Sequence, residues 1–125
     1  MLRDIDFYSA SLSAQIAVPP AFLGRVLEAC GNGIEFRAHA GSGVAQIISP
    51  DKPLTDVAAK TVARWREVAR SARGNLRLIA AAPAIRDSLE FFDTPNDDAL
   101  ALMRRLKAAF DPAGIFNPGC FVGGI

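Results

Sequence analysis

Apolar and polar residues alternate with a period of two in segments 11–18 and 34–40. This alternation predicts two half-buried strands. The glycine-rich turn at 41–43 leads from the second of these into segment 44–49, so a β-hairpin is expected there. Segment 76–82 is largely apolar and predicts a fourth strand, placed in the interior of a sheet.

Apolar residues recur at helical spacing between these strands. One helix is expected to open at the Pro19-Pro20 pair and to stop at the glycines after residue 30. A longer helix is expected from about residue 54 to 73, with Trp65 in its apolar stripe. We expect Trp65 and Phe22 to be buried between the sheet and the helices.

The last third of the chain predicts one more helix and an irregular tail. Thr94 is expected to cap this helix, with Pro95 at its first position, and the helix should run to about Phe110. Segment 111–125 is rich in glycine and proline and has no periodicity. The expected apolar stripe of the helix is formed by Ala99, Met103, Leu106 and Phe110.

The predicted order is β-α-β-β-α-β, followed by a helix and a tail. Two split β-α-β units of this kind form a ferredoxin-like sandwich with an antiparallel four-stranded sheet, so an α+β fold is expected. Right-handed crossovers place both helices on one face of the sheet. We predict a single domain, 1–125, with its core at about 10–83 and the last helix and tail at 94–125.

The helix-covered face is expected to carry Leu12, Ile16, Ile34 and Phe36. The open polar face is expected to carry Ser11, Ser13, Gln15, Glu35, Arg37 and His39.

Composition narrows the function classes. The chain has 125 residues, half of them apolar, and a net charge of +1, which predicts one folded domain without a nucleic-acid or anionic-membrane footprint. An RNA-recognition domain shares the β-α-β-β-α-β order but needs stacking aromatics on its open face, where none is expected. No apolar run approaches the roughly 20 residues that span a bilayer, and a cytoplasmic location is expected. Cys30 and Cys120 are expected to be free thiols.

Composition and spacing alone indicate no reaction. No serine sits in a nucleophile elbow, and His39, the only histidine, could complete at most one catalytic triad. No Cys/His cluster has zinc spacing. The glycines at 41–43 join two strands rather than opening a helix, which favours a hairpin turn over a phosphate loop. We therefore predict no catalytic residue in this chain from the pattern itself.

The tail carries a more specific signal. Residues 106–119, Leu-Lys-Ala-Ala-Phe-Asp-Pro-Ala-Gly-Ile-Phe-Asn-Pro-Gly, resemble the closing signature of FAD-linked oxidases with a C-terminal cap domain. This family includes glycolate oxidase and the D-lactate and D-2-hydroxyacid dehydrogenases. In physical terms, Asp111-Pro112 ends a helix and Asn117-Pro118-Gly119 makes a turn.

A second stretch, residues 39–46, resembles the segment His-x-Gly-Asp-Gly-Asn-x-His of the metal-dependent members. His39 and both glycines are kept, whereas Ser42, Val44 and Gln46 replace the Asp, the Asn and the second His. With one ligand left, no tightly bound metal is expected. This departure resembles the smaller FAD-binding subunit of glycolate oxidase, and the short ending 121–125 suits that subunit. Cys120 stands where the family usually has Arg or Lys.

The resemblance implies a cap or substrate domain of a glycolate-oxidase-like, FAD-dependent 2-hydroxy-acid oxidoreductase. In that family the FAD is held by a larger domain that this sequence lacks, so the chain alone is expected to bind no cofactor and to be inactive. Arg37, His39 and Gln46 are then candidates for the substrate cavity, and Asn117 for a place near the flavin.

The implied partners are the flavin-binding domain or sister subunits, and a small 2-hydroxy acid. A homodimer through exposed apolar surface is a further expectation. The alternative is a free-standing ferredoxin-like module for ligand binding or assembly, because the fold alone does not determine function.

Overall fold

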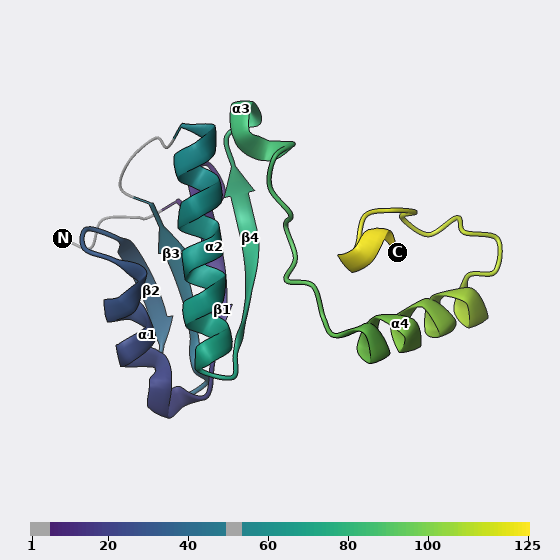
Figure 1. Cartoon of the computed structure of the whole chain (residues 1–125), viewed down its shortest axis with the longest axis horizontal. Helices are drawn as coiled ribbons and strands as arrows, with labels where there is room; N and C mark the ends of the chain where they lie inside the picture. The colour runs from purple at the N-terminus through teal and green to yellow at the C-terminus, as the bar shows by residue number, and fades with distance from the viewer. Residues whose placement is uncertain (1–5, 50–53) are drawn as a thin grey trace. The chain divides into compact units, whose positions relative to one another are not determined.

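The structure, a computed structural model, describes residues 6–49 and 54–125. It has an α+β fold with a four-stranded antiparallel sheet in the order β2-β3-β1-β4, so the ferredoxin-like prediction is confirmed (Figure 1). The elements of this sandwich are β1 (Leu12–Ala17), α1 (Leu23–Cys30), β2 (Glu35–His39), β3 (Val44–Ile48), α2 (Thr55–Ser71) and β4 (Asn75–Ala81). Each lies within two residues of its expected bounds, apart from the start of α1.

The chain divides into two compact units, Met1–Phe91 and Phe92–Ile125. The first unit holds the sandwich and the short helices η1 (Pro20–Phe22) and α3 (Pro83–Arg86). The second holds α4 (Asp97–Phe110) and η2 (Val122–Gly124). The boundary falls in the connection expected between the core and the last helix, and the single-domain assignment stays a prediction.

The core of the first unit lies between the sheet and the helices α1 and α2, which cover the same face of the sheet (Figure 1). Trp65 is only 1 % exposed, as expected. The expectation for Phe22 is wrong, because its side chain is 38 % exposed. The Pro19-Pro20 pair is followed by the 3-10 turn η1, and α1 begins after it, so Leu23 rather than Phe22 faces the core.

Strands β2 and β4 form the two edges of the sheet. The prediction that 76–82 is an interior strand is therefore wrong. The strand is apolar because the chain that follows it covers its outer side: the Leu78 N–H donates to the Phe91 carbonyl at 2.7 Å, and Ile85 is buried in the core. At the other edge, Phe36 pairs with the fully buried Ile47 but is itself 49 % exposed, so the helices do not cover it as expected.

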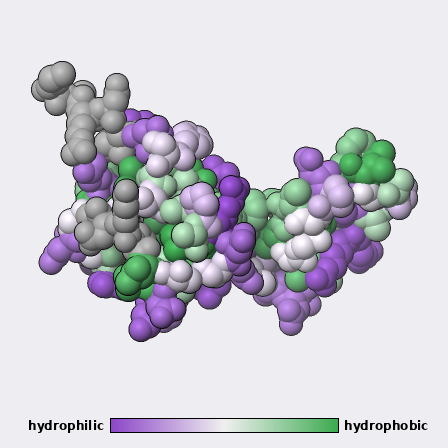
Figure 2. Space-filling view, turned by 90° about the horizontal axis from the view of Figure 1, so that it is seen from above, coloured by the Kyte–Doolittle hydropathy of each residue, from purple (hydrophilic) through white to green (hydrophobic). Residues whose placement is uncertain are grey.

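Helix α4 begins at a different residue from the one expected. Asn96, not Thr94, is the N-cap, and its side-chain oxygen accepts from the Ala99 N–H at 2.8 Å. No residue of α4 is buried, so the apolar stripe with Met103 and Leu106 does not pack into a core within the described residues. Apolar side chains consequently gather on the surface of the second unit (Figure 2).

Candidate functional site

One row of polar side chains crosses the sheet face that the helices leave open. Strand register pairs Arg37 of β2 with Gln46 of β3, Gln46 with Gln15 of β1, and Gln15 with Arg77 of β4. Directly paired residues point to the same face, so these four side chains share one level of the sheet. The row thus has a guanidinium at each end and two carboxamides in the middle.

Hydrogen bonding divides the row into an organised end and a free centre. An Arg77 guanidinium N–H donates to the Gln15 side-chain oxygen at 3.0 Å, which links the side chains of β4 and β1. The Gln46 carboxamide makes no hydrogen bond within the described part of the chain. It therefore keeps its full donor and acceptor capacity for a ligand.

Arg37 is held by an aromatic ring instead. Its guanidinium carbon lies 5.3 Å from the ring centroid of Phe7, a cation–π contact. Phe7 itself is only 3 % exposed, and its carbonyl accepts a hydrogen bond from the Ser13 hydroxyl. The segment around Phe7 thus covers part of the open face. This explains why Ser13, expected on a solvated surface, is fully buried.

His39 lies on the same face, two residues further along β2, opposite Val44. Its ring Nδ1 is 2.9 Å from the Ser42 hydroxyl, and its carbonyl accepts from the Ser42 and Gly43 N–H groups in the turn. The structure therefore brings Arg37 and Gln46 side by side and places His39 beside them. Asn117 belongs to the second unit.

Two members of the row were not among the sequence candidates. Gln15 was assigned to the open face but not to the site, although its position in an alternating strand was a usable signal. Arg77 is the only charged residue of β4. Because this strand was expected in the interior of the sheet, Arg77 was not considered as a site residue. Only the pairing register shows that both residues lie level with Arg37 and Gln46.

The described residues contain no cluster of three or more His, Cys, Asp or Glu side chains that would hold a metal ion. Ser42 and Gln46 stand where the metal-dependent pattern has its other ligands, and Ser42 bonds to the histidine itself. The absence of a tightly bound metal stays a prediction. Both cysteines are free thiols, and burial raises the pKa of Cys30 to about 11.

A carboxylate organises the tail of the second unit. The Asp111 side chain accepts from the Ile115 N–H at 3.0 Å and the Phe116 N–H at 2.9 Å, and it pairs with the Lys107 ammonium at 2.6 Å. Lys107 also donates to the Phe116 carbonyl. This network explains why an acid and a lysine four residues apart belong to the closing signature: together they fold the chain back after α4.

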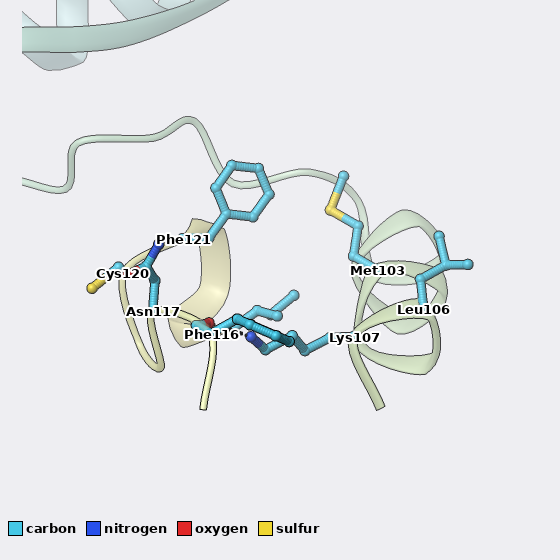
Figure 3. Close-up of a pocket in the computed structure, with 8 residues that line it drawn as sticks. Met103, Leu106, Lys107, Phe116, Asn117, Cys120 and Phe121 are labelled. Atoms are coloured by element: carbon cyan, nitrogen blue, oxygen red, sulfur yellow. Dashed lines mark hydrogen bonds between the residues drawn. The ribbon is translucent and has the colours of Figure 1, made fainter. Parts of the chain in front are cut away.

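The same network bounds a pocket of about 430 Å³ in the second unit (Figure 3). Met103, Leu106 and Lys107 line it from α4, and the tail contributes Asn117 and Phe121 among others. The pocket is mainly apolar. The Asn117 backbone is in the left-handed region, with φ of 45°, so this turn residue adopts a conformation that asparagine tolerates better than most.

The protonation of Asp111 gives a prediction for low pH. The hydrogen bond from Lys107, together with those from Phe116 and Ile115, lowers the pKa of this carboxyl to about 2 despite its burial. A lowered pKa contributes stability above the ordinary carboxyl pKa, and this contribution is lost as the pH falls through the folded value. We therefore expect the amide NMR signals of Ile115 and Phe116 to stay unchanged at about pH 4 and to shift near pH 2.

The Ala99 amide is the matched control, because it is capped by the neutral Asn96 side chain and should not follow this titration. In Asp111→Asn the step at low pH should be absent. A step near pH 4 in the original chain would contradict the ion-pair account.

The comparisons with known proteins agree with the family resemblance of the tail. The family model described as FAD linked oxidases, C-terminal domain, matches residues 86–120, a stretch that includes α4 and the Asp111 network. The match supports a domain of an FAD-linked oxidase, a family whose complete enzymes use FAD and hence a flavin-binding partner domain. The searches of curated proteins and of solved structures gave no significant match. No described helix is long and apolar enough to cross a membrane.

Proposed function

We propose that this chain is the cap domain of a glycolate-oxidase-like flavoenzyme that oxidises small 2-hydroxy acids. The observation that supports this most strongly is the family match over residues 86–120, where Asp111 and Lys107 hold the tail in a defined fold. In this proposal the open face of the sheet lies over the reactive side of the flavin.

The cap would bind and orient the substrate. Arg37, fixed by its contact with Phe7, is suited to hold a carboxylate through charge-assisted hydrogen bonds. Gln46 is free to bond the substrate hydroxyl, and His39 lies at the rim. Asn117 is assigned a place near the flavin. When bound in the complete enzyme, FAD supplies the hydride acceptor.

The described residues do not fit the whole cofactor. A pyrophosphate site needs free N–H groups at a helix start, commonly behind a glycine-rich loop. Here α1 follows the prolines of η1, α2 carries the acid Asp56 in its first turn, and the first turn of α4 is capped by its own Asn96. We therefore assign the cofactor to the partner domain and derive no redox step within this chain.

It follows that the isolated chain should neither bind FAD nor oxidise glycolate. Adding excess FAD to the purified chain should leave flavin fluorescence unchanged, and glycolate-dependent dye reduction should stay at the level of the blank. Binding tighter than about 10 μM, about 7 kcal/mol, would contradict the assignment of the cofactor to another domain. Turnover without a partner would overturn the proposal.

A positive test uses a flavin-loaded domain of an FAD-linked oxidase that is encoded next to this chain. Adding the cap should protect the flavin from solvent quenching and confer activity on a 2-hydroxy acid. Lys107→Gln serves as the matched variant, because it breaks the Asp111 network but leaves the sheet face intact. If this variant works as well as the original, the tail is not part of the docking surface.

A free-standing binding module remains the second candidate, and one observation favours it. The first unit has a complete core of its own, and the family match reaches only its last residues, from 86 onward. Ligand binding without any interaction with a flavin domain would support that reading.

The expected homodimer would use the exposed apolar side chains of the second unit, such as Phe110 and Ile115.

A further inference from the structure

The open sheet face carries more positive charge than one small monocarboxylate needs. Arg37 and Arg77 stand at the two ends of the polar row. Among residues 6–49 and 54–125, their side chains contact the Phe7 ring and the Gln15 carboxamide, and neither contact neutralises a guanidinium. Glu35 is the only acid among the strand residues of this face, and it lies two residues along β2 from Arg37, level with Ile48 rather than within the row.

We propose that this row binds a 2-hydroxy acid with two carboxylates, one at each arginine and with its hydroxyl on the central glutamines. The proposal rests on the proposed function and narrows its substrate class from small 2-hydroxy acids to short dicarboxylic ones. Gln15 and Arg77 become specificity-determining residues. Arg37 alone would suffice for a monocarboxylate.

The spacing of the row fits such a ligand. Neighbouring strands are about 4.8 Å apart, so the backbones of Arg37 and Arg77 are separated by about 14 Å. The Arg77 guanidinium donates to Gln15 of the neighbouring strand, so it is held toward the centre of the row. Two long arginine side chains that reach over this backbone distance, with charge-assisted hydrogen bonds of about 2.8 Å at each end, can hold a short diacid between them.

The central residues suit the middle of that ligand. Gln15 already uses its oxygen to hold Arg77, so its amide N–H groups remain as donors. Gln46 has both its oxygen and its N–H groups available within the described part of the chain. A hydroxyl between two carboxylates needs one acceptor and one donor, and Gln46 offers both at the centre of the row.

The test compares two ligands that differ in a single group. Malate and 2-hydroxybutyrate share a four-carbon skeleton and a 2-hydroxyl, but only malate has a second carboxylate. The purified full chain is titrated with each at fixed ionic strength, and binding is followed by ¹H–¹⁵N NMR shifts of the sheet residues. We expect malate to bind at least about tenfold more tightly.

Two variants assign the difference. Arg77→Gln should lower the affinity for malate to within about twofold of that for 2-hydroxybutyrate, whose own affinity should not change. Arg25→Gln removes the same charge from the exposed surface of α1, on the helix side of the sheet, and should leave both affinities unchanged. Equal binding of the two acids, no binding of either, or an equal loss in Arg25→Gln would overturn the proposal.

These outcomes are separate from the test of the proposed function. A chain that activates a flavin domain but does not prefer malate is a cap for monocarboxylates. A chain that prefers malate but does not interact with any flavin domain is a binding module with the same dicarboxylate site.

Discussion

Replacing Trp65 with alanine is expected to lower the free energy of unfolding of the first unit by about 4 kcal/mol, since truncating a buried Trp typically costs about 3–5 kcal/mol. Trp65 is the largest of the fully buried side chains and lies in the core between α2 and the sheet. Its indole N–H also donates to the Cys30 carbonyl at 3.1 Å, which ties α2 to the end of α1. The alanine variant loses both the packing and this bond.

The measurement is urea unfolding followed by far-UV circular dichroism, because the variant has no tryptophan left for fluorescence. Trp65→Phe keeps most of the packing and should cost about half as much, so it remains measurable if the alanine variant does not fold. Val57→Ala on the same helix is the matched control: Val57 is 51 % exposed and should change stability by less than about 0.5 kcal/mol. Equal effects at both positions would mean that Trp65 is not in the core.

The sandwich could be predicted from local pattern because its core is one-sided. The alternation in β1 follows the burial of Leu12, Ala14 and Ile16, and the helical stripe of α2 follows that of Trp65. Both patterns arise from a single buried face, so the period in the sequence directly reflects the structure. The order of the strands then follows from handedness and short connections.

The errors occur where a distant segment changes what a residue contacts. Ser13 points to the open face as expected, but Phe7 covers it, and no periodicity in β1 could show this. Strand β4 is apolar because the chain reaching Phe91 covers its edge, not because it is central. Both errors concern tertiary coverage, which local patterns do not encode.

The candidate site could be predicted only in part from the sequence. The alternation in β2 predicts Arg37 on the open face, whereas Gln46 is a candidate only through the resemblance of residues 39–46, and the structure pairs the two directly. Joining them to Gln15 and Arg77 requires the register of three strand pairs. Register depends on turn geometry and on the bulge between Ser13 and Ala14, so the complete row could not be found from the sequence.

Gly43 is expected to be the most sensitive position of the β2–β3 turn. Its φ is +70°, and a Cβ added there would lie only 1.9 Å from the Val18 carbonyl oxygen. That approach is tied to a hydrogen bond from the Val18 N–H to the Gly43 carbonyl at 2.9 Å, which joins the turn to the end of β1. The glycine kept in this part of the family pattern thus has a structural role, which is to let two backbones meet.

Gly43→Ala should therefore cost about 3 kcal/mol or more, since the left-handed conformation and the displaced backbone each cost about 1–3 kcal/mol. Gly41→Ala is the control in the same turn, because its Cβ would meet only the His39 ring at 3.8 Å, and it should cost less than about 1 kcal/mol. Urea unfolding with Trp65 fluorescence measures both.

The Gly43 variant should also shift the His39 ring signals in NMR, because the Gly43 N–H bonds to the His39 carbonyl in this turn. If the two variants are equally stable, the close approach at Val18 does not hold the turn in place. The position of His39 beside Arg37 would then need another cause.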